Sequence, residues 1–348
     1  MRISTLLSYA SGFKEAVKEV QALEKAGLDV VWVPEAYSFD APSAMGYLAA
    51  NTERVTIASG ILPVYSRTPS LLAMTAAGID YLSDGRCMLG LGASGPQVIE
   101  GFHGVPYTAP VSRIREVIDI CRMVWRREKV NYDGKYYQIP LPQNQGTGLG
   151  KPLKLINHPL RDEIPIAIAS LGEKSVEMTA ELADAWLPAF YMAEGADDVW
   201  GDALRAGAAK RDPGRAPLEV FAGGGVAIGE GLEDLRNMGR PGMALYIGGM
   251  GARSKNFYNQ VFCKYGYEAE AKQIQDLYLA GKKDEAEAAI PQRYLDATSL
   301  IGPEGFVKDR LAALKESGVN ALNVSFAGRT LDERIDYCEK LRNLVDSM

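Results

Sequence analysis

Eight short apolar runs recur along the chain, and most of them are apolar at successive positions. Continuous apolar runs of this length are typical of strands buried on both faces of a parallel sheet. Segments with apolar residues at helical spacing separate most of the runs, for example from Ile114 to Trp125. The predicted strands are residues 2–9, 30–33, 55–62, 87–92, 166–169, 185–189, 218–228 and 319–326.

Strands that alternate with helices eight times predict an α/β fold, a parallel (β/α)8 TIM barrel. A doubly wound open sheet is the alternative. It is weakened because no GxGxxG motif follows the first strand, although Gly90, Gly92 and Gly95 have that spacing after the fourth.

Two stretches interrupt the alternation. Residues 127–163 contain Asp133-Gly134, a hairpin-turn signal, and a loop rich in Gly and Pro. Residues 236–292 are mostly helical in pattern. We therefore expect a single barrel domain over residues 1–348, with insertions at about 127–163 and 236–292.

Composition narrows the classes of function. The net charge is -6 without a basic block, which argues against nucleic acid as a partner. No apolar run is long enough to span a membrane. The four cysteines are far apart and form no CxxC pair, so we expect a reduced, cytoplasmic protein. With two histidines and no metal-ligand spacing, a metal site is not predicted.

The turn after the fifth predicted strand has the composition of an anion site. Gly172 and Ser175 are small, Lys174 is cationic, and a helix begins near Glu173. The first N–H groups of a helix have no internal partner and carry a partial positive charge, so a phosphate would bind there. The same residues also fit an ordinary strand–helix turn, and the local sequence leaves both interpretations open.

Active sites of such barrels lie at the C-terminal ends of the strands. We therefore expect one site formed by Glu35, residues 60–65, 92–98 and 170–175, and Phe190. No arrangement of nucleophile and base stands out.

Several stretches resemble the bacterial luciferase-like flavin superfamily. They are VVWVPEAYSFDAPSAMGYLAA, SGILPVYSRTPSLLAMTAAGIDYLSDGR, LGLGASGPQVIEGFHGVPY and IASLGEKSVEMTAELADAWLP. The closest likeness is to the deazaflavin branch, whose oxidoreductases use coenzyme F420, and PGMALYIGGMGARSKNFYNQVFCKYGYEAEA resembles one subgroup of it. The resemblance covers nearly the whole chain and implies a luciferase-like barrel, a flavin-type cofactor and a homodimer.

The resemblance also implies where the cofactor binds. The ring would lie against the third strand, at a position where the family often carries a non-prolyl cis peptide, here Gly60-Ile61. The phosphate would bind at the turn described above. The implied cofactor-binding residues are Glu35, Gly60, Ile61, Ala93, Ser94, Gly95, Gln97, Val98, Leu171, Gly172, Lys174 and Ser175.

Glu35 and His103 are the candidate catalytic residues. Glu35 matches a position where the family often has an acid facing the cofactor, although a carboxylate ion-paired at a strand end is the structural alternative. His103 could donate a proton near the substrate or pack against a helix, and Tyr65 and Arg67 could face the pocket. The Asp-His pair and the loop Glu of the sugar-phosphate dehydrogenases in this branch are missing, which makes glucose 6-phosphate an unexpected substrate.

These features predict a coenzyme F420-dependent oxidoreductase that exchanges a hydride with a small organic substrate. An FMN-dependent monooxygenase using O₂ is the first alternative. A flavin-binding protein without turnover is the second.

Overall fold

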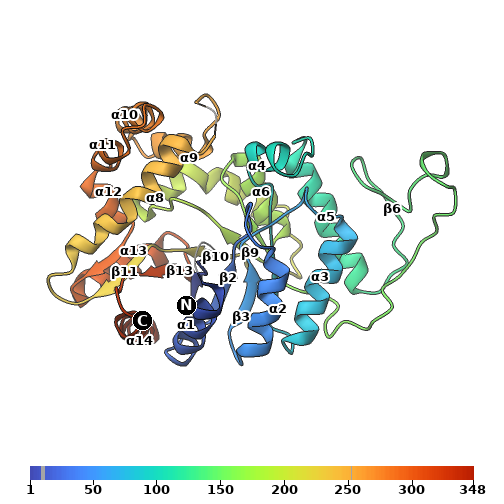
Figure 1. Ribbon diagram of the computed structural model, residues 1–348, viewed down its shortest axis with the longest axis horizontal. Coiled ribbons are helices and arrows are strands. Elements are labelled where there is room, and N and C mark those ends of the chain that lie inside the picture. Colours follow the sequence, from blue (N-terminus) through green and yellow to red (C-terminus); the bar gives the residue numbers. More distant parts are fainter. Residues whose placement is uncertain (9–11, 252) are drawn as a thin grey trace.

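The computed structural model describes residues 1–8, 12–251 and 253–348, and its centre is a closed barrel of eight parallel strands (Figure 1). The last strand pairs with the first, with Arg2 opposite Ala321, so the sheet has no open edge at this point. The predicted (β/α)8 barrel is confirmed, and the open doubly wound sheet is excluded. The barrel strands are β1 (Arg2–Leu6), β2 (Val30–Val33), β3 (Thr56–Ser59), β5 (Cys87–Gly92), β8 (Ile166–Ala169), β9 (Ala185–Leu187), β10 (Glu219–Ala222) and β13 (Ala321–Phe326).

Two predicted strands are interrupted. The third stops at Ser59 and resumes as β4 (Leu62–Pro63), and the Gly60-Ile61 peptide between the two parts is cis. The seventh continues beyond Ala222 as β11 (Gly225–Ile228), which pairs with both β13 and β12 (Leu300–Gly302). A glycine is required at the second break, because a Cβ on Gly224 would lie 1.9 Å from the Thr298 carbonyl oxygen. Tyr9, the predicted end of the first strand, lies outside the described residues.

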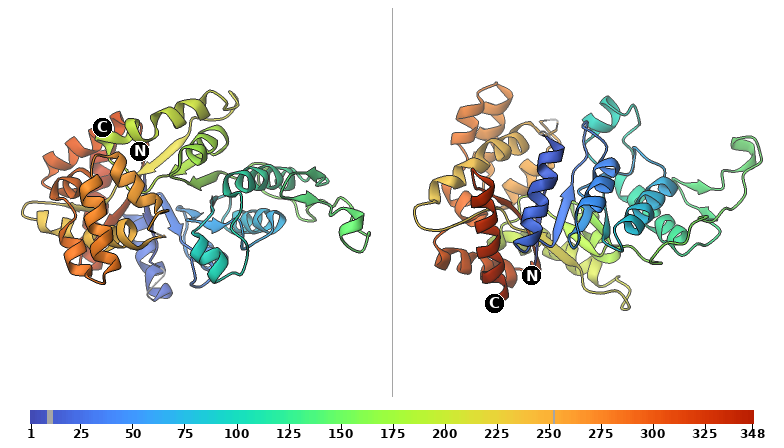
Figure 2. Two further views of the ribbon diagram at one scale, coloured as in Figure 1. Left: turned by 90° about the horizontal axis from the view of Figure 1, so that it is seen from above. Right: turned by 60° about the horizontal axis from the view of Figure 1, so that its bottom comes forward.

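Helices cover the outside of the barrel, and N-capping hydrogen bonds fix several of their starts. Thr68 accepts from the Leu71 N–H in front of α3, and Thr330 forms a capping box with Glu333 in front of α14. The N- and C-terminal helices lie side by side (Figures 1 and 2). The outer helices are α1 (Phe13–Lys25), α2 (Ala41–Asn51), α3 (Pro69–Leu82), α5 (Pro110–Trp125), α6 (Glu173–Leu182), α7 (Asp202–Ala208), α13 (Glu304–Glu316) and α14 (Leu331–Asp346).

Two stretches extend the barrel. Residues 126–163 form an arm that projects beyond α5 and carries the antiparallel pair β6 (Tyr132–Asp133) and β7 (Gln138–Ile139) (Figure 2). Residues 233–297 form a helical group next to α13. The short helices are α4 (Pro96–Gly101), η1 (Gln143–Gln145), η2 (Ala193–Gly195), η3 (Asp197–Gly201), η4 (Glu233–Gly239), α8 (Arg240–Ala244), η5 (Leu245–Gly249), α9 (Phe257–Lys264), α10 (Glu268–Leu279), α11 (Lys283–Ala288) and α12 (Gln292–Ala297).

Large aromatic side chains fill the barrel interior. The rings of Trp32 and Phe221 meet edge to face at 5.1 Å, and the Trp32 indole N–H donates to Ser4 Oγ at 2.9 Å. Neighbouring strands contribute small inward residues, among them Ala58 and Ala167, which leave room for the two rings. In the described part of the chain no helix could cross a membrane, and no group of side chains there could hold a metal ion.

Candidate active site

The mouth of the barrel, at the C-terminal ends of its strands, is wide and poor in side chains. Alternate residues of a strand face the same side, so Leu6 and Gly60 lie one layer above the inward-facing Ser4 and Ala58. Leu6 is 53% exposed although it belongs to a barrel strand. The mouth is therefore open to solvent above the aromatic core.

Glycines replace side chains where β3 and β5 reach this mouth. A Cβ on Gly90 would lie 1.7 Å from the carbonyl oxygen of Ser59, so no larger residue fits there. The Ser59 hydroxyl donates to the Gly90 carbonyl at 2.9 Å and accepts from the Gly90 N–H at 2.8 Å, which ties the two strands together. Cβ atoms on Gly60 and Gly92 would come within 3.0 Å of Trp32 and 2.9 Å of Ile61, respectively. The result is a closely packed wall of backbone, in which Gly90 and Gly92 are buried and Gly60 is partly exposed.

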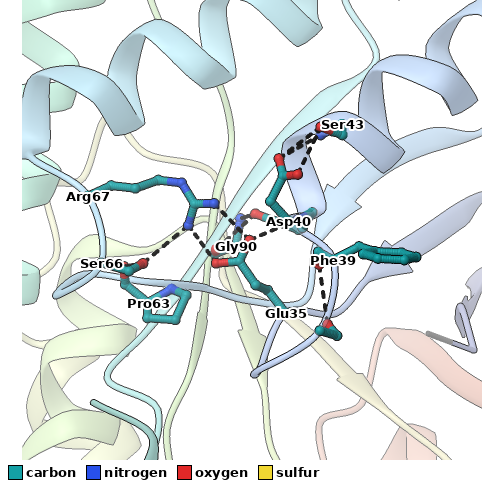
Figure 3. Close-up of polar contacts among 11 residues, drawn as sticks. Glu35, Phe39, Asp40, Ser43, Pro63, Ser66, Arg67 and Gly90 are labelled. Atoms are coloured by element: carbon teal, nitrogen blue, oxygen red, sulfur yellow. Dashed lines mark hydrogen bonds and ion pairs between the residues drawn. The ribbon is translucent and has the colours of Figure 1, made fainter. Parts of the chain in front are cut away.

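A buried ion pair stands next to this wall, at the end of β2 (Figure 3). Arg67 donates from Nη1 to Glu35 Oε1 at 2.5 Å and from Nη2 to Oε2 at 2.8 Å. The Ala41 N–H donates to the same Oε2 at 2.8 Å. The Glu35 side chain is 6% exposed and the Arg67 side chain 13%. Glu35 therefore holds the β2–α2 connection against the β4–α3 connection, and its observed partners are those of an ion-paired carboxylate.

His103 follows α4 at the rim. Its backbone N–H donates to the Val98 carbonyl at 3.2 Å, and its ring meets the edge of Phe102. Its Nε2 atom is buried and has no hydrogen-bond partner among the described residues. Since buried polar atoms are normally paired, this nitrogen can take a hydrogen bond from a bound molecule or water.

The loop that follows β5 is held by tyrosines. Ser94 has a left-handed backbone conformation with φ of 58°, and its carbonyl accepts from the Tyr107 hydroxyl at 3.2 Å. The Tyr65 ring lies 5.2 Å from that of Tyr107, and its hydroxyl donates to the Thr108 carbonyl. The predicted loop residues Ala93, Ser94, Gly95, Gln97 and Val98 thus lead from the mouth into α4, which begins at Pro96.

The first turn of α6 has no side-chain cap, as an anion site requires. Gly172 occupies the N-cap position, and the Ser175 hydroxyl donates back to the Gly172 carbonyl at 2.7 Å. Lys174 is exposed. The N–H groups of Ser175 and Val176 already donate to the Gly172 carbonyl, so an anion would use the N–H groups ahead of them, and the lysine charge adds to that of the helix end.

Two indoles fix the segment in front of α6. Trp186 donates to the Ser170 carbonyl at 3.0 Å, and Trp200 donates to the Leu171 carbonyl at 2.9 Å. The two rings also meet edge to face at 5.3 Å. The two indole hydrogen bonds therefore fix the backbone of Ser170 and Leu171, the residues that lead into the first turn of α6.

An aromatic group above β9 was not predicted. Phe190, with a left-handed φ of 59°, contacts Tyr246 and Tyr258, whose rings lie 4.8 Å apart. Burial, with Tyr246 and Tyr107 nearby, raises the pKa of Tyr258 to about 12. The phenol therefore stays protonated at neutral pH. Nothing in the local spacing of these residues indicated that they meet, because the contact joins segments more than 50 residues apart in the chain.

Basic side chains lie on both extensions of the barrel, the arm of residues 126–163 and the helical group, but they do not form one cluster. Lys151 and Lys154 lie on the arm, whereas Arg253 is ion-paired with Asp276 in the helical group, where Lys255 is exposed. They therefore give no single basic patch.

Comparison with known proteins places this geometry in a family. A family model described as luciferase-like monooxygenase matches residues 1–321. A protein of Mycobacterium tuberculosis, whose name assigns it provisionally to the coenzyme F420-dependent oxidoreductases, is 39% identical over 311 residues, 88% of this chain and 89% of that protein.

Solved structures share the fold. The coenzyme F420-dependent tetrahydromethanopterin reductase from Methanopyrus kandleri has a TM-score of 0.81 at 18% identity, covering 99% of this chain and 98% of its own. An F420-dependent secondary alcohol dehydrogenase, in complex with an F420-acetone adduct, has a TM-score of 0.74 at 16% identity, with the same coverage. At these identities the likeness shows the barrel and its arrangement.

Proposed function

The chain belongs to the luciferase-like monooxygenase family, and on that premise we propose that it is a coenzyme F420-dependent oxidoreductase. It would transfer a hydride between the deazaflavin and a small organic substrate. The observation that carries the choice of cofactor is the 39% identity, over most of both chains, to the provisionally F420-dependent relative.

The geometry fits a flavin-type cofactor. The closely packed wall of β3 and β5 would support the ring, with Gly60 as its partly exposed residue. The uncapped first turn of α6, with Leu171, Gly172, Lys174 and Ser175, would hold the phosphate. Ile61 and the loop residues 93–98 would line the chain between ring and phosphate.

The cofactor supplies the hydride chemistry when bound, and the protein supplies binding, orientation and a shaped site. His103 is the proposed proton-transfer group, because its buried Nε2 is unpaired. Glu35 is proposed to act with Arg67, keeping the rim of the site in place and contributing hydrogen-bond acceptor capacity. The remaining rate enhancement would come from placing the substrate carbon over the ring.

An FMN-dependent monooxygenase that uses O₂ is the alternative that the family description itself favours. A flavin-binding protein without turnover is the second alternative. Dependence of turnover on O₂ would indicate the first, and cofactor binding without hydride transfer the second.

We also propose a homodimer, formed through α2 and α3. The helix α2 has no charged residue, and the outward face of α3 exposes four large apolar side chains, Leu71, Met74, Tyr81 and Leu82. Exposed apolar patches of this kind mark interaction surfaces. In sedimentation experiments the wild type should be a dimer and the Met74→Lys variant a monomer, and a monomeric wild type would contradict the proposal.

The deciding experiment is a titration of the purified protein with F420 and, separately, with FMN, followed by fluorescence. Tight binding of F420 with weak binding of FMN supports the proposal and justifies a substrate screen. Preference for FMN would favour the monooxygenase, and binding of neither would remove the functional claim while leaving the barrel.

A further inference from the structure

A cavity of about 570 Å³ lies beside the C-terminal ends of β1 and β2, next to the first turns of α1 and α2. Its inner wall includes Leu7 and Val33, which pack in the core between barrel and helices rather than in the barrel interior. The cavity is therefore separate from the mouth, where Leu6 is the exposed neighbour. We propose that it binds an uncharged, mainly apolar small molecule.

Aromatic and aliphatic side chains make up most of the lining. Phe13 and Tyr47 face each other across the two helices, with ring centroids 5.9 Å apart. Phe39, which is 89% exposed, stands at the opening. A volume of 570 Å³ lies within the range of about 300–1,000 Å³ that is usual for small-molecule sites.

The charged groups at the cavity are hydrogen-bonded or lie in solvent. The Asp40 carboxylate accepts from the Ser43 N–H at 3.1 Å and from the Ser43 hydroxyl at 2.9 Å, so it serves as the cap of α2 (Figure 3). Lys14 and Glu15 on α1 are exposed, so their charges lie in solvent rather than inside the cavity. None of the buried, unpaired side-chain atoms among the described residues belongs to the lining. A charged ligand would lose its hydration here without gaining a partner, whereas a neutral apolar one would gain burial.

The cavity shares a wall with the candidate active site. Ala41 lines the cavity, and its N–H donates to Glu35, which Arg67 holds from the other side. A molecule in the cavity would therefore contact the start of α2, which the Glu35–Arg67 ion pair also holds in place. The molecule with the required chemistry is an apolar effector, because a substrate must lie over the ring at the mouth.

The test uses 1-aminoanthracene, a neutral fluorescent aromatic, titrated into the protein without cofactor, so its result does not depend on the proposed function. We expect saturable binding to the wild type. The Ala44→Trp variant, which fills the cavity, should bind about tenfold more weakly or less. Phe39→Ser should also weaken binding, and because Phe39 is exposed this change should leave the thermal midpoint unchanged. Phe257→Ser, an exposed aromatic at the start of α9 and outside the proposed dimer face, is the matched control and should bind like the wild type.

The proposal would be overturned if both cavity variants bound the probe as well as the wild type, or if the Phe257 control lost as much binding as they did. So would displacement of the probe by F420, which would place it at the barrel mouth. Weakening of probe binding as the protein concentration rises would assign the cavity to a second copy of the chain instead. A compound that displaces the probe and is not consumed in the presence of reduced F420 supports the proposal, whereas its consumption would place it at the mouth and overturn the proposal.

Discussion

The guanidinium of Arg67 binds both carboxylate oxygens of Glu35 at 2.5 and 2.8 Å, and both side chains are largely buried. The two residues are 32 positions apart and belong to different strand–helix connections. Paired in this way, the carboxylate fixes the rim of the barrel mouth and, through the Ala41 N–H, the start of α2. The Glu35–Arg67 pair therefore connects the candidate active site with the neighbouring cavity, through the Ala41 N–H that it accepts from.

Removing one member of this pair should destabilise the protein. Arg67→Met leaves Glu35 buried without its charge partner, and we expect a loss of about 3 kcal/mol in the free energy of unfolding. Urea denaturation measures this. Arg205→Met, which breaks an exposed pair with Asp197, is the control and should change stability by less than about 1 kcal/mol. Equal effects of the two changes would show that the buried pair is no more important than a surface one.

The close approach at Gly90 should tolerate no side chain. In Gly90→Ala the new Cβ would overlap the Ser59 backbone, and backbone cannot move aside as a flexible side chain can. We expect a thermal midpoint lower by about 3–4 °C, because overpacking costs roughly 2–3 kcal/mol and unfolding a chain of 348 residues gains about 0.7 kcal/mol of entropy per degree. Gly305→Ala in α13, where a Cβ meets nothing within 4 Å, is the matched control. It should leave the midpoint unchanged or raise it, because alanine is the better helix former.

Lys174 should contribute to anion binding at the first turn of α6. With Lys174→Ala we expect cofactor affinity to fall about threefold to tenfold, which corresponds to one exposed charge beside a helix end. The loss should shrink as salt is added. Lys18→Ala on α1, also an exposed lysine, should leave affinity unchanged. An unchanged affinity in the Lys174 variant at low salt would place the phosphate elsewhere.

Alkaline pH should weaken the fold through Tyr258. Its pKa is about 12 in the folded chain, against an ordinary value of 10.0, so between these values the folded state keeps a proton that the unfolded state loses. The stabilisation is therefore present below pH 10 and is lost as pH rises towards 12. Tyr258→Phe cannot ionise, and its urea midpoint should fall less between about pH 9 and pH 11 than that of the wild type.

The control for this pH effect is Tyr37→Phe, which removes the hydroxyl of a 70% exposed tyrosine outside the proposed dimer face. Its pH dependence should match the wild type. If the Tyr258 variant lost stability as steeply as the wild type, the alkaline loss would arise from other buried phenols, such as that of Tyr265.

The sequence by itself determined the order and approximate place of the eight barrel strands and the turn at Gly172, after which α6 begins at Glu173. These features depend on the periods of strand and helix and on the residue types at a turn, which are local properties. The family resemblance extended this to the non-prolyl cis bond at Gly60-Ile61, which the structure has.

Only the tertiary structure decided how Glu35 is partnered, where the strands break, and which aromatic residues meet Phe190. Each of these results from contacts between distant segments, such as the backbone of Thr298 against Gly224 or Arg67 against Glu35. The cavity between α1 and α2 has the same origin, since its volume is what remains after two helices pack on two strands. A linear pattern records which side of an element is apolar, but the distance between two elements, and hence a cavity or an ion pair, is fixed only when the whole barrel closes.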